Sequence, residues 1–334
     1  KDQKSVTVRI TTTDEAGWDI TCADWVGASK TSGTNTADLT FTPKDNSTKS
    51  ARNASVVIRS KVTGQSSTIS FSQDAYVFDE TAKTFSTLFE EISSKNKAQE
   101  VDVTCTEGAG WTVNAPSWIK VTGTGTSEVT KGTGTTKLKI TTKENNLSTT
   151  TDRTDYVIIK SDIGGYEKRV TVKQRKYTWS VSGMSDLTLD PDEDASQNIS
   201  IQSSGNWTAE FDKQDSDFVS LSVASGVGNR LSTISTRLEV EKNYTQQKRE
   251  AVLTIQSEHS ANASNLKQQM RITQDRYVYE VSVPDMEFEA DKDLTNTSVK
   301  GLKCTGDLEV SKPSSASWIK EVRISSSGTL TVTV

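Results

Sequence analysis

The chain has 334 residues, of which 25% are charged, and its net charge is −5. This balance leaves no basic stripe for nucleic acid, whose phosphates require clustered Lys and Arg. No window approaches the 18 consecutive apolar residues of a membrane-spanning helix. The apolar content of only 32% does not indicate disorder, because Ser and Thr fill the polar positions of alternating segments and Thr favours strands.

Short alternating segments predict β-strands along the whole chain. Apolar residues recur with a period of two, and Gly, Asn, Asp and Ser punctuate the runs. In chain order the clearest examples are residues 1–10, 100–105 (EVDVTC), 137–142 (KLKITT), 156–161 (YVIIKS) and 168–174 (KRVTVKQ). One stretch, residues 84–98 (TFSTLFEEISSKNKA), fits either a short helix or a strand with a bulge. The fold class expected is therefore all-β.

An internal repeat of about 100 residues organises the chain. The segments QDAYVF, QRKYTW and QDRYVY begin at Gln73, Gln174 and Gln274, which are 101 and 100 residues apart. That period is the size of one immunoglobulin-like β-sandwich. We predict four repeats: residues 1–77 (repeat 1, without its first strand), 78–177 (repeat 2), 178–277 (repeat 3) and 278–334 (repeat 4, without its C-terminal strands).

The chain enters and leaves this pattern inside a repeat. A half-sandwich exposes apolar faces and open strand edges, so we expect the natural chain to continue beyond residue 334. Residues 1–10 already form a predicted strand, so the given sequence does not begin with a signal peptide. The protein is either cytoplasmic or has lost a signal and more, and the repeats favour the second. Cys22, Cys105 and Cys304 fall in three different repeats and are expected to be small buried strand residues without disulfides.

The junctions between repeats are short. Gln174 shares a strand face with the apolar residues Val170 and Val172, so its amide points inward at the end of the strand. A buried amide must be hydrogen-bonded, and main-chain groups at the seam are the expected partners. Because no flexible linker intervenes, we predict an elongated, semi-rigid rod of tandem sandwiches.

The order of these features resembles the BACON domain, named for Bacteroidetes-associated carbohydrate-binding often N-terminal. The features are W-x6-W-[IV], a Gly/Ser/Thr loop, an alternating strand, Asn, Arg, an apolar strand and a terminal V-x-V-x-Q. The pattern covers 18–73 and 111–174 well. It is looser over 207–274, where Phe218 replaces the second Trp, and partial from Leu308, which replaces the first. The resemblance implies a β-sandwich, a surface or periplasmic location in gut-type bacteria, and a proposed glycan-binding role.

The tryptophan pairs carry the functional question. The first aromatic of each repeat (Trp18, Trp111 and Trp207) shares a strand face with apolar residues, which predicts a buried core pillar. By the same parity the second aromatic turns outward, where its ring could stack on a pyranose. The candidate glycan-binding residues are Trp25, Trp118, Trp318 and Phe218. The alternative is that they cover the end of the sandwich beneath Arg52 or Arg153 as a cation–π lid.

Enzymatic features are poor. The single histidine, His259, lies in the polar loop SEHSANASN with no Cys or Ser constellation around it, and no carboxylate pair recurs as a glycosidase needs. Residues 123–134 (GTGTSEVTKGTG) lack the spacing of a phosphate loop and are expected to be a hairpin tip. The run 190–194 (DPDED) begins like a calcium loop, but Ala195 and Ile201 replace its Gly and Glu, which favours a solvated turn. We expect no cofactor, no metal and no enzymatic activity.

The sequence therefore predicts a non-enzymatic secreted or cell-surface protein. The leading interpretation is binding or adhesion to glycans or mucin-type glycoproteins. The alternative is a structural stalk that holds another domain away from the membrane. Binding predicts that Trp25 and Trp118 are exposed, whereas a stalk predicts that they are buried. We expect the Arg residues to be structural and not ligand-binding: the head of each side chain should bond carbonyls or a carboxylate at the end of the sandwich.

Overall fold

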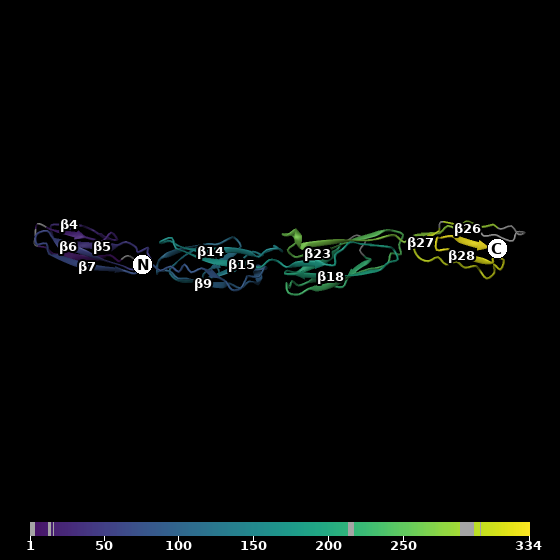
Figure 1. Ribbon diagram of the computed structural model, residues 1–334, viewed down its shortest axis with the longest axis horizontal. Coiled ribbons are helices and arrows are strands. Elements are labelled where there is room, and N and C mark those ends of the chain that lie inside the picture. Colours follow the sequence, from purple (N-terminus) through teal and green to yellow (C-terminus); the bar gives the residue numbers. More distant parts are fainter. Residues whose placement is uncertain (1–3, 13–14, 16, 213–216, 288–296, 301) are drawn as a thin grey trace. The chain divides into compact units, whose positions relative to one another are not determined.

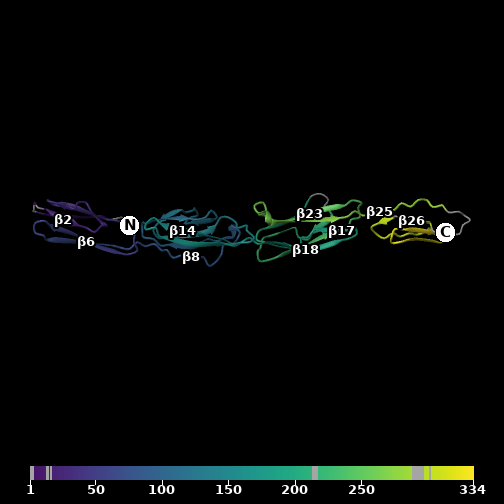
Figure 2. The ribbon, with the colours of Figure 1, turned by 45° about the horizontal axis from the view of Figure 1, so that its top comes forward.

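Two β-sheets packed face to face form each of the first three repeats. The computed structural model describes residues 4–12, 15, 17–212, 217–287, 297–300 and 302–334. The chain divides into two compact units, residues 1–176 and 177–334. Figure 1 labels the strands, and Figure 2 shows the same sheets after a 45° turn. The all-β, sandwich-type fold class is confirmed, while the four predicted repeat boundaries stay predictions.

In the first unit, consecutive strands alternate between the two sheets of each repeat, except the last two, which pair with each other. Repeat 1 contains β1 (Val6–Ile10), β2 (Trp18–Thr21), β3 (Val26–Ala28), β4 (Ser32–Gly33), β5 (Ala37–Pro43), β6 (Arg52–Ser60) and β7 (Ser66–Gln73), in the sheets β1-β5-β3 and β4-β2-β6-β7. Repeat 2 contains β8 (Lys83–Thr84), β9 (Gln99–Val103), β10 (Gly110–Asn114), β11 (Ile119–Thr122), β12 (Lys131–Thr133), β13 (Thr136–Thr142), β14 (Arg153–Ser161) and β15 (Glu167–Gln174), in the sheets β11-β13-β9 and β12-β10-β14-β15-β8.

In the second unit, repeat 3 has the same topology and repeat 4 has two smaller sheets. Repeat 3 contains β16 (Trp179–Ser182), β17 (Leu187–Leu189), β18 (Ala195–Ser203), β19 (Trp207–Phe211), β20 (Val219–Leu221), β21 (Ser225–Gly226), β22 (Ile234–Val240), β23 (Arg249–Ser257) and β24 (Lys267–Gln274), in the sheets β16-β18-β22-β20 and β17-β24-β23-β19-β21. Repeat 4 contains β25 (Tyr279–Glu280), β26 (Thr297–Val299), β27 (Lys303–Cys304), β28 (Glu321–Ile324) and β29 (Leu330–Thr333), in the sheets β25-β27 and β26-β29-β28.

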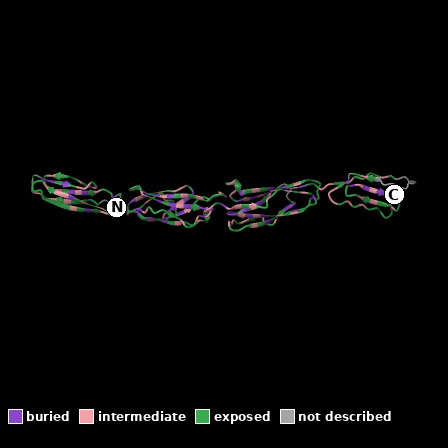
Figure 3. Ribbon diagram, in the orientation of Figure 1, coloured by how far each residue is buried: buried purple, intermediate pink, exposed green. Residues whose placement is uncertain are grey.

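Alternation along the strands builds the cores. In repeat 2, Val101 and Ile140 from one sheet meet Val157 and Val170 from the other, and all four are at most 3% exposed. The residues between them face solvent, so buried and exposed colours alternate along the strands in Figure 3. This period-2 burial is the pattern that the sequence predicted.

The first tryptophan of each repeat is a core pillar, as predicted. Trp18, Trp111 and Trp207 are 2–3% exposed. Each ring also requires a glycine on the neighbouring short strand. In repeat 2, a Cβ on Gly132 would lie 2.2 Å from the Trp111 ring. Gly33 and Gly226 are in the same position beside Trp18 and Trp207, so any side chain there would displace the indole.

The stretch 84–98 is neither of the two expected structures. Among the described residues helical structure is limited to 3-10 turns, at Ser93–Lys95 and Ser264–Leu266. Phe89 and Ile92 are buried, and Phe89 forms an isolated parallel bridge with Gln174. The apolar residues that suggested a helix thus lie in an irregular segment along the edge of β15.

No helix in the described parts of the chain is long and apolar enough to cross a membrane.

The two loops that resembled ligand-binding motifs are closed by their own contacts. Thr122 pairs with Glu128 across the loop that begins at residue 123. In the acidic run, the Glu193 amide donates to the Asp190 carbonyl at 3.2 Å, and the Asp190 amide donates to the Glu193 carboxylate at 3.1 Å. Of the cysteines, Cys105 is buried as expected, whereas Cys22 and Cys304 are partly exposed.

A buried lysine in repeat 2 depends on one carboxylate. Lys168, on β15, is 5% exposed, and its ammonium contacts the Asp79 carboxylate at 2.5 Å. The Thr81 amide also donates to Asp79, at 2.9 Å. These contacts, chiefly the hydrogen bond from Lys168, lower the Asp79 pKa from 3.8 to about 2. A charge removed from water in this way requires its partner.

This ion pair predicts a specific acid sensitivity. The folded pKa of Asp79 lies below the unfolded value, so its contribution to stability is present above about pH 4 and is lost as the pH falls through about 2. Denaturant unfolding between pH 6 and pH 2 should show a shallower loss of stability in Asp79→Asn, which is already less stable at pH 6. The exposed Asp102→Asn is the matched control and should follow the wild-type curve. Equal pH slopes for Asp79→Asn and wild type would contradict the assignment.

Candidate functional site

The second aromatic of each repeat sits in a turn, not in a strand. In repeat 2, the Ile119 amide donates to the Pro116 carbonyl at 3.0 Å, which places Trp118 within the turn that precedes β11. Alternate residues of a strand point to opposite faces, but this alternation does not continue into a turn. The expected outward orientation is therefore wrong for Trp118 and Phe218, which are 5% and 3% exposed. Trp25 occupies the same kind of turn and is half-buried.

An arginine covers each of these rings. The distances from guanidinium carbon to ring centroid are 4.5 Å for Arg52 and Trp25, 4.4 Å for Arg153 and Trp118, and 4.4 Å for Arg249 and Phe218. A guanidinium stacks well on an aromatic face while its N–H groups donate in its own plane. The geometry thus matches the cation–π lid, the alternative interpretation of these aromatics.

The same arginine is held by a glutamine from the last strand of its repeat. Register pairs Arg153 at the start of β14 with Gln174 at the end of β15. Arg153 Nε and Nη2 donate to Gln174 Oε1 at 3.2 and 2.5 Å, and Nη2 also donates to the Glu144 carbonyl at 3.0 Å. Arg52 with Gln73 and Arg249 with Gln274 repeat this pairing. The expectation that these arginines are structural, with guanidinium groups bonded to carbonyls, is confirmed.

The glutamine amide nitrogen donates to main-chain carbonyls. Gln174 is fully buried, and its Nε2 lies 3.1, 3.2 and 3.0 Å from the carbonyls of Glu90, Glu91 and Glu144. The fully buried Gln274 donates to the Asp190 and Glu193 carbonyls. The expectation of main-chain partners for the inward glutamine is confirmed.

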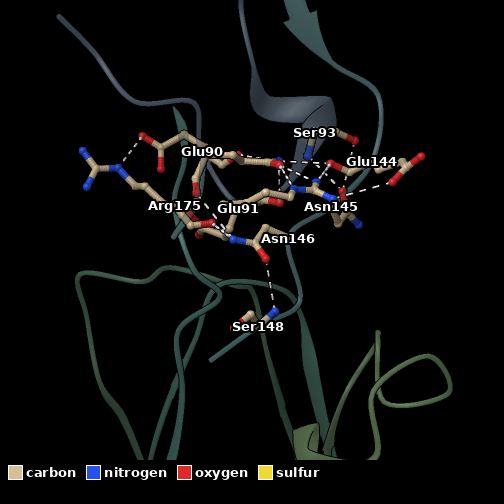
Figure 4. Close-up of polar contacts among 10 residues, drawn as sticks. Glu90, Glu91, Ser93, Glu144, Asn145, Asn146, Ser148 and Arg175 are labelled. Carbon is tan, nitrogen blue, oxygen red and sulfur yellow. Dashed lines mark hydrogen bonds and ion pairs between the residues drawn. The ribbon is translucent and has the colours of Figure 1, made fainter. Parts of the chain in front are cut away.

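An asparagine completes this group by holding the chain that leaves the sandwich. Asn146 Nδ2 donates to the Arg175 carbonyl at 2.8 Å, and its Oδ1 accepts the Ser148 amide at 3.3 Å. Figure 4 shows Asn146 between Glu91 and Ser148, with the Arg175 side chain directed toward Glu90. Asn46 and Asn243 make the equivalent bonds to the Asp74 and Asp275 carbonyls.

We name this arrangement the end cluster: one turn aromatic, one Arg, one Gln and one Asn in each repeat. Its members are Trp25, Arg52, Gln73 and Asn46 in repeat 1; Trp118, Arg153, Gln174 and Asn146 in repeat 2; and Phe218, Arg249, Gln274 and Asn243 in repeat 3. Burial lowers the pKa of the Arg153 and Arg249 guanidinium groups, and the nearby Glu144 and Glu241 charges oppose that shift. Both remain cations, as the ring stacking requires.

The fourth candidate aromatic differs. Trp318 lies in the corresponding turn, closed by the Ile319 amide donating to the Ala316 carbonyl at 3.1 Å, and it exposes 58% of its surface. Residues 278–334 contain no counterpart of the strands that bear Arg and Gln in the other repeats. Trp118 and Phe218 are buried, and the exposure of Trp318 accompanies the absence of those two strands from residues 278–334.

Each linker tyrosine enters the next sandwich. Tyr76, three residues after Gln73, is 4% exposed, and its hydroxyl lies 2.6 Å from Ser161 Oγ and 3.3 Å from Cys105 Sγ. Burial is the main reason that the pKa of Tyr76 rises to about 12. Tyr177 makes the equivalent contact with Ser257 Oγ at 2.7 Å. The sequence showed these tyrosines as repeat markers but did not show their hydroxyl partners.

The chemistry of the end cluster is that of a structural device. Its arginine and amide nitrogens bond to main-chain carbonyls and to one another, and it contains no nucleophile or general base. Within the described ranges, no group of three or more His, Cys, Asp and Glu side chains is arranged to hold a metal ion. The sequence could not reveal the Gly–Trp contacts, since glycine 132 is 21 positions from its indole.

Comparison with protein families identifies what these repeats are. Residues 16–74, 109–175 and 205–275 match the BACON family, described as "Putative binding domain, N-terminal". The matched segments make up more than half of the chain, and the chain belongs to this family. The resemblance seen in the sequence is thereby confirmed in three tandem copies. Comparison with curated protein sequences gives no match.

Solved structures with similar folds include tandem arrays. The I9–I11 tandem of titin is 9% identical, with 82% of this chain and 93% of that chain covered and a TM-score of 0.32. Cadherin domains 1–4 of protocadherin gamma B7 are 8% identical, with 95% and 83% covered and a TM-score of 0.30. A GH5 xyloglucanase from Bacteroides ovatus is 19% identical over 31% of this chain, with a TM-score of 0.23. This chain spans a fifth of that enzyme's length.

The end cluster predicts unequal costs for removing its glutamines. Gln174→Leu leaves three carbonyls and the Arg153 guanidinium without this partner in a buried site, and should lower the free energy of unfolding by about 3 kcal/mol. Gln73 is half-buried and donates to one carbonyl, so Gln73→Leu should cost only about 1 kcal/mol. Denaturant unfolding of the whole chain measures both. Equal costs for the two variants would show that burial of the amide does not determine its contribution.

Proposed function

We propose that this chain is a non-enzymatic spacer within a secreted or cell-surface protein, built from BACON sandwiches that hold another domain at a distance. The observation that carries the proposal is the closure of the end cluster. Trp118 and Phe218 are buried beneath Arg153 and Arg249, and Trp25 is half-buried beneath Arg52. The two buried rings offer no platform to a sugar, and the Arg52 guanidinium occupies one face of Trp25.

The linkers support the same role. Between Gln73 and Tyr76 only two residues intervene, and the Asn46 amide bonds to the Asp74 carbonyl within that linker. Gln73 is tied to repeat 1 through Arg52, and Tyr76 is buried in repeat 2 with Ser161. A linker that is anchored at both ends suits a spacer better than a flexible tether does.

Glycan binding or adhesion is the second candidate function. The family description as a binding domain favours it. The ligands would be glycans or mucin-type glycoproteins, as the sequence led us to expect. In this function the binding residues would lie outside the end clusters of repeats 1 to 3.

A glycan and mucin screen combined with thermal melts separates the two functions. Trp118→Ala should destabilise repeat 2 by about 3 to 5 kcal/mol, since it empties a packed site and removes the Arg153 stack, and should leave any glycan binding unchanged. Trp318→Ala is the matched control: its melt should stay close to wild type, and it should lose binding only if this exposed ring is a platform. Loss of saturable binding in Trp118→Ala, at an unchanged melting temperature, would overturn the spacer assignment of the end cluster.

A further inference from the structure

A groove on repeat 3 borders its end cluster, because the carbonyl of its lining residue Glu241 accepts a hydrogen bond from Arg249. It has a volume of about 610 Å³ and is lined by residues of β18, β20 and β22 and of the segment after β22. Tyr244 comes from the segment after β22, and Arg237 and Glu239 come from β22 itself. This volume falls within the range of small-molecule sites. Such sites are mostly apolar, whereas the groove is lined mainly by charged and hydroxyl groups, which suits a polar ligand better than an apolar one.

Tyr244 is an exposed aromatic side chain held on a fixed backbone. It exposes 73% of its surface, although its neighbour Asn243 is fully buried. Asn243 Oδ1 accepts the Thr245 amide at 3.0 Å and the Thr245 hydroxyl at 2.7 Å. These bonds fix the chain on the C-terminal side of Tyr244. The corresponding positions in repeats 1 and 2 are Ser47 and Leu147, so the aromatic ring is particular to repeat 3.

The floor of the groove brings donors and acceptors together on three neighbouring strands. Register places Ser196 and Ser220 directly opposite Glu239, one on each side. All three side chains are exposed, so they form one row on the outer face of the sheet. Arg237 Nε contacts the Glu239 carboxylate at 3.2 Å, which orients both groups toward the same row.

The remaining charges narrow the class of ligand. Asp194, Glu239 and Glu241 contribute three carboxylates to the lining, against the two cations Arg237 and Lys242. This excess of negative charge disfavours sulfated, sialylated or uronic acid chains. A neutral sugar carries hydroxyls that both donate and accept, and its ring has an apolar face that can lie on a tyrosine.

We propose that this groove binds a neutral oligosaccharide, with Tyr244 as the stacking platform and the row of Ser196, Glu239 and Ser220 bonding to sugar hydroxyls. The proposal rests on the second candidate function, glycan binding, and goes beyond the spacer role. It assigns binding to one repeat of the array, on the outer face of a sheet, at a place where the other two repeats carry no aromatic ring.

The test uses the whole chain with a panel of neutral oligosaccharides (cellohexaose, mannohexaose and xylohexaose) and a heparin-derived hexasaccharide. Calorimetric titration should show saturable binding of at least one neutral ligand and none of the anionic one. Tyr244→Ala should weaken that binding at least about tenfold at an unchanged melting temperature. The control is Tyr156→Ala, which removes a tyrosine that is 42% exposed on repeat 2 and should leave the affinity unchanged.

Each other outcome is decisive. Binding that survives Tyr244→Ala, or that favours the anionic ligand, would overturn the groove assignment and leave glycan binding elsewhere on the chain. Absence of binding to every member of the panel would overturn the groove proposal. If the wider glycan and mucin screen also gave no binding, glycan binding as a function would fail with it. Amide shifts limited to residues 194–196, 220 and 237–244 on titration would place the ligand in the groove independently of the variants.

Discussion

A buried amide with no access to water is the constraint on which the ends of these sandwiches depend. Gln174 lies fully inside the protein at the last position of its strand, and a polar group there must find partners or destabilise the fold. Its nitrogen donates to main-chain carbonyls of two different segments, and its oxygen accepts hydrogen bonds from the Arg153 guanidinium. The arginine then needs a surface to lie on, which the turn aromatic provides. One hydrogen-bonding requirement thus links a strand end, a turn and an irregular segment.

This linkage also explains why the same four residue types recur about every hundred residues. The partners of the cluster are mostly main-chain carbonyls, which exist whatever the side chain. The sequence between the cluster members can therefore vary widely without loss of the arrangement. Phe218 replaces tryptophan in repeat 3 because the guanidinium requires an aromatic face and not an indole nitrogen.

Much of the fold could be predicted from the sequence, since period-2 alternation and a hundred-residue repeat are properties of the chain itself. The core pillars, the inward glutamines and the structural arginines all followed from parity. Parity failed at Trp118 and Phe218 because these residues lie in turns, where successive side chains no longer alternate between two faces. The prediction for residues 84–98 was wrong for a related reason: the apolar residues there are buried against the edge of β15 without regular periodicity. The Tyr244 groove depends on register between strands that are distant in the sequence, and no local pattern reveals it.

The glycine beside each core tryptophan limits how these repeats can change. Any side chain at Gly132 would enter the space of the Trp111 ring. A functional side chain therefore cannot replace this glycine without displacing the core tryptophan. The outer faces of the opposite sheet have no such restriction. Diversification in a family of arrays built this way would therefore accumulate on one side of each module, and ligand preferences could differ between neighbouring copies of a single chain while the modules stay mutually interchangeable.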